Sequence, residues 1–225
     1  MVLVGSAGSG PPGSPNLSPD FPATPLEDVA VLTPTRLETW AARRRLPRAR
    51  VHRIGIGGSR GLPEPPGPAI VCGLAGGLDP SLEPGDVVIA DAAALPGEDP
   101  IPTDPELTGR LEQAARSLGL RTARGPVLTA PHLVTGSGRR QWPGFLAADM
   151  EAAHVLRLRP RTAAIRVVLD TGARELSPDW ERPALAGLRP RRWAELLRLA
   201  REAPGAALLA ASVVRAALSP SPPRS

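Results

Sequence analysis

Three carboxylates lie at the edges of expected helices and strands, where they could do chemistry. Glu38 stands in a helix that follows an apolar run, Glu151 near the start of a second helix, and Asp170 directly after a β-branched strand. The carboxyl ends of parallel strands meet at one edge of a sheet, where such folds bind ligands. A pair of carboxylates there can supply general acid and base or hold sugar hydroxyls. Taken singly, each is better explained by a structural role, since an Asp after a strand is usually a helix cap.

Glycines follow two of the expected strands and would let a ligand approach the backbone closely. They stand in GIGG at 55–58 and in GLAGG at 73–77. Backbone amides freed in this way can bind a phosphate or a sugar. We therefore take Gly57, Gly58 and Arg60 as a candidate phosphate or water site. GIGG is not the GxGxxG fingerprint, so a dinucleotide site gains no support.

Strand and helix patterns alternate along the chain. The pattern predicts strands at 29–33, 51–56, 69–72, 86–90, 121–128 and 163–169, and helices at 36–46, 105–118, 150–158, 193–203 and 206–218. Alternation of this kind predicts an α/β fold with helices on both faces of the sheet. The Gly/Ser/Pro-rich residues 1–27 and the tail 219–225 are expected to be disordered, which leaves one domain over 28–218.

Composition narrows the classes of partner. The 225 residues are 42% hydrophobic and carry a net charge of +5, with all 27 basic residues being arginine and no tyrosine present. The arginines are dispersed and lack interleaved aromatic residues, so we expect no nucleic-acid partner. No apolar run is long enough for a membrane span. The single cysteine, Cys72, excludes an internal disulfide and fits a cytoplasmic protein, in which it should be buried and inert.

We expect structural roles for one histidine and for one pair of arginines. His154 is expected to pack in the core. Arg139 and Arg140 could bind phosphate, but we expect them to begin a solvated helix. Three scattered histidines and one cysteine do not form a zinc-ligand spacing. We therefore predict neither a metal nor any other cofactor.

Four segments, taken together, resemble the nucleoside phosphorylase superfamily. They are VAVLTPTRLE at 29–38, IVCGLAGGLDPSLEPGDVVIAD at 70–91, ADMEAAH at 148–154 and IRVVLD at 165–170. The GLAGGLDP form and the DME-x-x-H stretch are most similar to the hopanoid-associated phosphorylase branch, close to the methylthioadenosine/S-adenosylhomocysteine nucleosidases and futalosine hydrolase. The resemblance implies a three-layer αβα sandwich with a central mixed sheet, and a homo-oligomer.

The resemblance also implies roles for individual residues in cleaving a ribosyl–purine bond. Asp170 would be the general acid at the purine N7, in an apolar surround, and Glu38 would position the attacking water. Glu151 would hold the ribose hydroxyls, with Met150 packed under the sugar. The remaining substrate-binding positions are Ala75, Gly76, His132 and Leu133, with His132 near the usual place of an aromatic stacker.

The chain departs from the family pattern at four places, one of which is a shortened segment between the DME stretch and Asp170. Leu74 and Leu169 replace serines, and the segment 60–68 is too short and proline-rich for the usual helix. The resemblance implies cleavage of the N-glycosidic bond of a 5′-substituted purine nucleoside. Adenine is the expected base, and an adenosylhopane-type compound is a candidate substrate. Hydrolysis and phosphorolysis both stay open, since Glu38 favours water while Arg60 could bind inorganic phosphate. The alternatives are a futalosine or methylthioadenosine/S-adenosylhomocysteine nucleosidase, and a catalytically degenerate nucleoside-binding protein.

Overall fold

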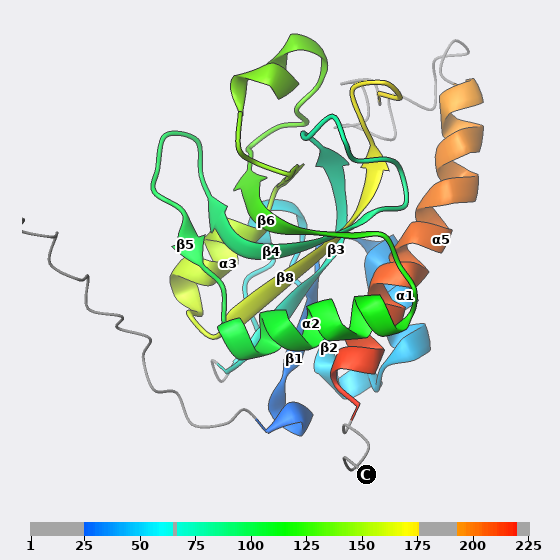
Figure 1. Ribbon diagram of the computed structural model, residues 1–225. Helices are drawn as coiled ribbons and strands as arrows, with labels where there is room; N and C mark the ends of the chain where they lie inside the picture. Colours follow the sequence, from blue (N-terminus) through cyan, green and yellow to red (C-terminus); the bar gives the residue numbers. More distant parts are fainter. Residues whose placement is uncertain (1–24, 65–66, 176–192, 220–225) are drawn as a thin grey trace, which may run out of the picture.

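The computed structural model describes residues 25–64, 67–175 and 193–219 (Figure 1). Its strands are β1 Ala30–Thr33, β2 Val51–Arg53, β3 Ala69–Gly77, β4 Val87–Ala94, β5 Ile101–Pro102, β6 Thr122–Thr129, β7 Ala147–Asp149 and β8 Thr162–Asp170. Its helices are α1 Arg36–Arg45, α2 Pro105–Ser117, α3 Ala152–Leu158 and α5 Trp193–Ala217. Short 3-10 turns stand at Leu26–Asp28, Arg48–Arg50, Ile56–Gly58 (η3) and Gly136–Gln141 (η4).

The eight strands form one mixed sheet that closes on itself. The order runs β2-β1-β3-β7-β6-β4-β5, and β8 pairs with both β3 and β4. β3, β8, β4, β6 and β7 therefore form a closed ring of paired strands. The ring closes where β7 pairs antiparallel with the end of β3, at Gly76 with Ala148 and Gly77 with Ala147. This closure brings the ends of β3, β7 and β8 to one place.

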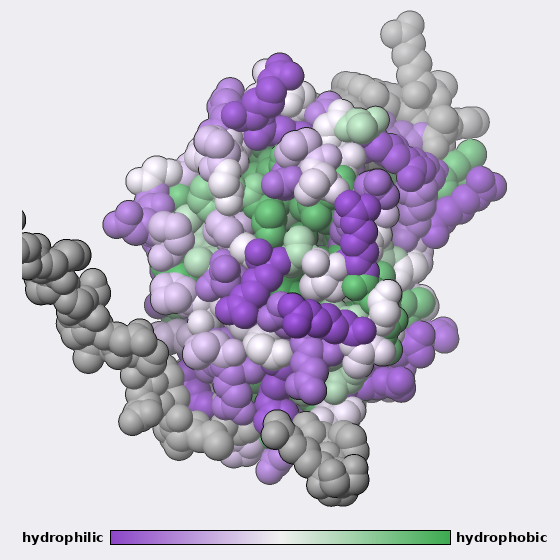
Figure 2. Space-filling model, viewed as in Figure 1, coloured by the Kyte–Doolittle hydropathy of each residue, from purple (hydrophilic) through white to green (hydrophobic). Residues whose placement is uncertain are grey.

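Helices cover both faces of the sheet and make three layers. α1, α2 and α5 share one core with alternate strand residues such as Ile70, Val87 and Ile165. The intervening residues, such as Val71 and Val88, pack against α3 on the other face. Because both faces are covered, the central strands are nearly continuous apolar runs. On the face seen in Figure 2, hydrophilic side chains cover the surface over α2, as expected for a helix with one buried side.

Side-chain caps fix where the helices begin. Thr35 and Glu38 form a reciprocal capping box at the start of α1. Asp104 caps α2, and Pro105 occupies its first turn, where proline is tolerated. Gly119, with φ +67°, follows the end of α2 in the left-handed region that glycine adopts readily.

The α/β prediction and the three-layer arrangement are confirmed, but several boundaries were wrong. β3 runs to Gly77, so its glycines lie within the strand rather than after it. β2 ends at Arg53, and Ile56 begins a 3-10 turn. α3 begins at Ala152, which leaves Met150 and Glu151 ahead of the helix. The described part of 60–68 holds no helix, as predicted.

Two further differences concern whole elements. The expected helices at 193–203 and 206–218 are one continuous helix, α5, with Pro204 inside it. The buried alanines 203, 207 and 210 hold it against the sheet despite the hydrogen bond that proline removes. β5 and β7 were not expected at all. Of the segments predicted to be disordered, 1–27 and 219–225, residues 1–24 and 220–225 lie outside the described residues. The prediction was wrong at the end of the first segment, because Leu26–Asp28 forms a 3-10 turn. The domain limits of 28–218 stay a prediction.

Within the described ranges, none of the helices combines the length and apolarity that crossing a membrane requires.

Candidate active site

The end of β3 is the element on which the candidate site is built. Leu74 donates its backbone N–H to Glu38 Oε1 over 2.8 Å. Two residues further on, Gly76 pairs in register with Asp170. A strand rises roughly 3.3 Å per residue, so the two carboxylates contact β3 at points roughly 7 Å apart. β3 therefore joins the two residues that were predicted to be catalytic.

Glu38 is buried, with 6% of its surface exposed, and both its oxygens have partners. Its Oε2 accepts the Thr35 backbone N–H at 2.8 Å and the Thr35 hydroxyl at 2.6 Å, while Oε1 accepts from Leu74. A Cβ at Gly73 would lie 2.5 Å from Glu38 Oε1 and 3.4 Å from Arg166 Nη1. Glycine at 73 is thus what lets this carboxylate and that guanidinium both approach the strand.

Arg166 is the centre of a buried charge cluster beside Glu151. Its guanidinium, on β8, is fully buried and donates to Asp149 Oδ2 from Nε, at 2.9 Å, and also from Nη2. Its Nη2 also lies 3.7 Å from Glu151 Oε2. Burial alone would lower the pKa of Arg166, but Asp149 and Glu151 outweigh it and hold the pKa above its usual value. Arg166 is thus a fixed cation at this cluster.

Asp149 ties the cluster to the backbone of α3. Its Oδ1 accepts the Thr129 hydroxyl at 2.6 Å, and its Oδ2 accepts the Ala152 backbone N–H at 3.0 Å. The same carboxylate therefore caps α3 and anchors Arg166. Its position on β7 fixes the two residues that follow, Met150 and Glu151.

Glu151 is held between this cluster and the first glycine loop. Its Oε1 accepts the Gly57 backbone N–H at 3.2 Å. Burial, with the nearby charge of Asp149, raises its pKa to about 8, against the lowering effect of Arg166. Glu151 is consequently protonated near neutral pH and can donate a hydrogen bond as well as accept one.

Asp170 reaches the site through an irregularity in β8. Val168 pairs with Ala75 and Asp170 with Gly76, so Leu169 is the additional residue of a β-bulge. Bulges of this kind re-aim the following side chain. A Cβ at Gly76 would lie 3.0 Å from Asp170 Oδ1, a tight contact that glycine avoids.

Arg139 faces Asp170, contrary to the apolar surround expected for this acid. Arg139 is 6% exposed, donates from Nη2 to Asp170 Oδ2 and from Nη1 to the Gly77 carbonyl, and forms a 3.2 Å ion pair with Glu175. The prediction that Arg139 begins a solvated helix was therefore wrong. The η4 turn brings its side chain inward because these acceptors line the end of the strands.

The predicted base-binding residues do come together around one cavity. It is lined by Gly76, His132, Leu133, Val134, Thr135, Ala148, Asp149, Met150 and Asp170. Its volume is about 30 Å³, roughly the room for one water. Pockets for small ligands are typically at least ~300 Å³. In this conformation the cavity is therefore closed to a ligand of that size. His132 is largely exposed at its rim, while Ala75 lies next to Gly76 on β3.

The three residues of the candidate phosphate site do not face one common site. Gly57 contacts Glu151 through its backbone N–H, and a Cβ there would lie 3.9 Å from the Met150 carbonyl. Gly58 and Arg60 face outward instead. Gly58 lines a groove beside α3, and Arg60 lines a separate groove beside α1 and β2. The structure therefore does not bring Arg60 to the carboxylates.

Two further residues can be compared with their predicted roles. Cys72 is buried, and desolvation raises the pKa of its thiol to about 12, which agrees with an inert structural cysteine. His154 was expected in the core but is exposed on α3. Within residues 25–64, 67–175 and 193–219, no cluster of His, Cys, Asp and Glu has the arrangement to hold a metal ion.

Sequence reasoning missed Asp149, Arg166 and Arg139. Arg166 had a usable signal, since it is the one charged residue within the apolar run 163–169. Buried charges are rare unless they are paired, so such an arginine predicts a carboxylate partner. Arg139 had no comparable signal, because its burial depends on how a loop folds back.

A family model supplies the identification. The model described as "Phosphorylase superfamily" matches residues 66–182, which include β3, the ring-closing β7 and the Arg166 strand. The chain belongs to this superfamily. No curated protein sequence matches it at a significant level.

Solved structures share the fold at low sequence identity. The 5′-methylthioadenosine/S-adenosylhomocysteine nucleosidase from Neisseria meningitidis, in complex with methylthio-immucillin-A, has a TM-score of 0.62 at 20% identity, over 84% of this chain and 97% of that one. Futalosine hydrolase of Helicobacter pylori has a TM-score of 0.63 at 13% identity, over 84% and 96% of the two chains. A nucleosidase from Colwellia psychrerythraea, in complex with adenine, has a TM-score of 0.62 at 15% identity, over 84% and 93%.

The superfamily predicted from the four segments is thus confirmed, as is the central mixed sheet with its flanking helices. With the superfamily comes the general class, a nucleoside-cleaving enzyme. The hopanoid-associated branch, the homo-oligomer and the roles of individual residues stay predictions.

Proposed function

We propose that this member of the phosphorylase superfamily hydrolyses the N-glycosidic bond of a 5′-substituted purine nucleoside, with adenine as the leaving base. The observation that carries the proposal is that Glu38, from α1, and Asp170, from β8, meet the same short stretch of β3, with Glu151 and Met150 nearby. N-glycosidic cleavage passes through an oxocarbenium-like transition state and needs an acid for the leaving base. Carboxylates on the sugar side would stabilise the positive charge that develops there.

Hydrolysis is favoured over phosphorolysis by the charge balance on the sugar side. Glu38, Asp149 and Glu151 surround Arg166, and Asp149 already occupies two of its donors. Even with Glu151 protonated, a phosphate dianion would meet the carboxylates of Glu38 and Asp149 against the one cation Arg166, whereas a water can be held by Glu38 and a backbone group. Arg60, the cation proposed for phosphate, lies in another groove.

On the base side, Asp170 would donate to the purine N7 once Arg139 has moved. Arg139 now occupies Oδ2 of Asp170, and the cavity is too small for a purine. Arg139 belongs to the η4 turn, whose neighbours Leu133 to Thr135 also line the cavity. A shift of this one loop would therefore open the base site and release Asp170 together.

For the 5′ substituent we propose an apolar group, as in the adenosylhopane-type substrate. A groove of about 670 Å³ adjoins Gly57, whose N–H contacts Glu151, and is lined by Leu62, Val155 and Leu158 among others. Leu158 is 70% exposed within it. An apolar chain leaving the ribose could cover this side chain. A polar 5′ substituent, as in futalosine or S-adenosylhomocysteine, would gain less from it.

One observation favours a second candidate, a nucleoside-binding protein without turnover. The ion pair between Arg139 and Asp170 is buried, and both partners have further contacts in the closed state. If nucleoside binding leaves this pair in place, Asp170 cannot reach the base. Adenine would then bind elsewhere in the site without being released from a substrate.

Chromatographic measurement of adenine release tests the proposal. The substrates are methylthioadenosine, S-adenosylhomocysteine, adenosine and a 5′-alkyl adenosine, each with and without inorganic phosphate. We expect release without phosphate, fastest for the 5′-alkyl substrate. Asp170→Asn should slow release by about 10²–10⁴-fold, the usual worth of a general acid.

Asp91→Asn is the matched control, since Asp91 is a partly buried carboxylate on β4 that does not line the cavity. It should release adenine like the parent protein. Release that requires phosphate would replace hydrolysis by phosphorolysis. Adenine binding with no release from any substrate would favour the second candidate.

A further inference from the structure

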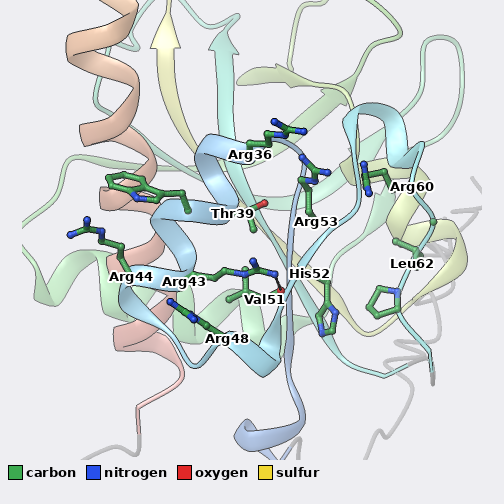
Figure 3. A pocket seen from close by; sticks show the side chains of 13 residues that line it. Arg36, Thr39, Arg43, Arg44, Arg48, Val51, His52, Arg53, Arg60 and Leu62 are labelled. Carbon is green, nitrogen blue, oxygen red and sulfur yellow. Dashed lines mark hydrogen bonds between the residues drawn. The ribbon is translucent and has the colours of Figure 1, made fainter.

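An arginine-rich groove lies outside the candidate active site, along α1, β2 and the segment 60–63. It has a volume of about 990 Å³ and is lined by Arg36, Thr39, Trp40, Arg43, Arg44, Arg48, Val51, His52, Arg53, Arg60, Gly61, Leu62 and Pro63 (Figure 3). Six arginines thus face one groove, and among the residues that the structure describes no carboxylate lines it. Below, these six are called the groove arginines.

The groove arginines lack the usual compensation for so much charge. Among the described residues, none of the six is in an ion pair with a carboxylate. Arg43 donates to the Val51 carbonyl at 3.5 Å, and Arg44 lies 5.0 Å from the Trp40 ring. The pKa of Arg53 is lowered by desolvation and by the charges of Arg60, Arg36 and Arg43. The groove is therefore a site of mutual repulsion between cations.

The arrangement of the side chains suits several anionic groups rather than one. In Figure 3, Arg36, Arg53 and Arg60 point toward one another at one end, and Arg43 and Arg48 lie at the other. Guanidinium groups bind phosphate oxygens through paired N–H donors, which makes arginine the preferred residue for phosphate recognition. Two separated sets of donors match a ligand whose phosphates are linked in a row.

We propose that this groove binds a soluble ligand with clustered phosphate groups, of the inorganic or nucleoside triphosphate class. Its volume lies at the upper end of the range for small-ligand pockets. Trp40, 40% exposed at the rim, offers a planar face on which a base could stack. The site differs from a co-substrate phosphate site, because neither Glu38 nor Asp170 lines it.

The groove also has a structural route to the active site. The loop 54–61 carries Arg60 on the groove side, while its Gly57 N–H contacts Glu151 on the other side. The Arg60 backbone N–H closes this loop on the Ile54 carbonyl at 2.7 Å. A phosphate ligand on Arg60 would therefore bind a loop that also contacts the proposed ribose-binding residue.

Isothermal titration of the full chain with inorganic triphosphate at low salt tests the proposal. We expect one site per chain, weakened by added salt as screening predicts. The double variant Arg53→Gln/Arg60→Gln should weaken binding at least about tenfold, about 1.4 kcal/mol. The matched control Arg45→Gln/Arg116→Gln removes two exposed arginines that do not line the groove, and should stay within about twofold of the parent value. Absence of binding, or equal weakening by both pairs, would overturn the proposal.

Two added arms define the ligand. Adenosine triphosphate should bind more tightly than inorganic triphosphate, and Trp40→Ala should remove that difference while leaving the inorganic ligand unaffected. Phosphatidylglycerol vesicles, with single phosphates spread over a surface, should not displace triphosphate at matched phosphate concentration. Displacement by the vesicles would overturn the assignment to a soluble ligand. Circular dichroism of each variant verifies that it is folded.

Discussion

Arg166 and Arg139 both face carboxylates in the candidate site, but they are held in different ways. Arg166 lies in the middle of β8, fully buried, and is bound to Asp149 at the end of β7. Arg139 lies in the η4 turn, between Asp170 and a Glu175 side chain that is 33% exposed. The first arrangement is built into the sheet, and the second depends on a loop.

This difference separates the two halves of the proposed reaction. The sugar side, around Arg166, is preorganised, since moving it would break strand pairing and uncap α3. The base side opens and closes with Arg139. Preorganised charge suits stabilisation of a transition state, whereas a movable loop suits entry and release of a ligand. The predictions below test whether the two arginines differ as described.

The largest effect is expected from Arg166→Met. It leaves Asp149 and its neighbouring carboxylates buried without a cation, which typically costs about 3–5 kcal/mol. Arg139→Met should cost clearly less in urea unfolding, because Asp170 and Glu175 can turn toward solvent when the loop opens. Equal losses in the free energy of unfolding would contradict the distinction between a fixed and a movable arginine.

The next largest effect is expected on adenine binding when Arg139, in the η4 turn, is replaced. Arg139→Gln removes the group that adenine must displace from Asp170, so adenine affinity should rise by roughly tenfold, about 1.4 kcal/mol. Equilibrium titration of both proteins measures the change. Arg140→Gln, an exposed neighbour in the same turn, serves as the control. Weaker adenine binding in Arg139→Gln would mean that Arg139 itself binds the base.

Stability should depend on pH through Glu151. Its pKa is about 8 in the folded protein against an ordinary value of 4.5, so the folded state keeps a proton that the unfolded state releases between these values. The contribution is complete below pH 4.5 and is lost as pH rises toward 8. The slope is at most about 1.4 kcal/mol per pH unit.

The measurement is the free energy of unfolding between pH 5.5 and 7.5, for the parent protein and for Glu151→Gln, which cannot titrate. The difference between the two curves should fall steadily as pH rises. Parallel curves would show that Glu151 is ionised in the folded protein across this range. If both curves fall with rising pH, the extra proton of the folded state belongs to another group of the cluster.

The smallest effect is expected at the β-bulge. Leu169→Ser restores the residue type of the family pattern at a partly buried position, and should cost about 1 kcal/mol or less. Adenine release should change by less than about threefold, because the bulge is set by the pairing of Val168 and Asp170 with β3. A loss as large as that of Asp170→Asn would show that Leu169 itself determines where the acid points.

Most of the fold was predictable because its central strands are buried on both faces. The apolar runs around Ile70, Val88 and Ile165 give a strong signal, and the capping pattern at Thr35 and Glu38 marks a helix start. β7 was missed because Ala147–Asp149 is short and has no β-branched residue. Yet this strand closes the ring and positions Met150 and Glu151. Local propensity therefore did not reveal the element on which the site depends.

The resemblance predicted which residues form the candidate site, but it did not predict the contacts between them. Gly76, Leu133, Met150 and Asp170 do line one cavity. The pairing of Asp170 with Arg139 joins residues 31 positions apart through a turn, which no periodicity encodes. Arg60 was assigned by its nearness in sequence to Gly57. The Gly57 backbone N–H contacts Glu151, whereas the Arg60 side chain lines the groove beside α1 and β2. Contacts made by loops depend on tertiary packing and were beyond the sequence pattern.

The most direct test of the central claim is to identify the sugar product of the reaction. The reaction is run with a 5′-alkyl adenosine in ¹⁸O-labelled water, with inorganic phosphate present, and the products are analysed by mass spectrometry. We predict free adenine and a free 5′-alkyl ribose that carries one ¹⁸O atom at C1, with Asp170→Asn forming far less of both. A sugar 1-phosphate, or an intact nucleoside in the presence of folded protein that binds adenine, would contradict the account.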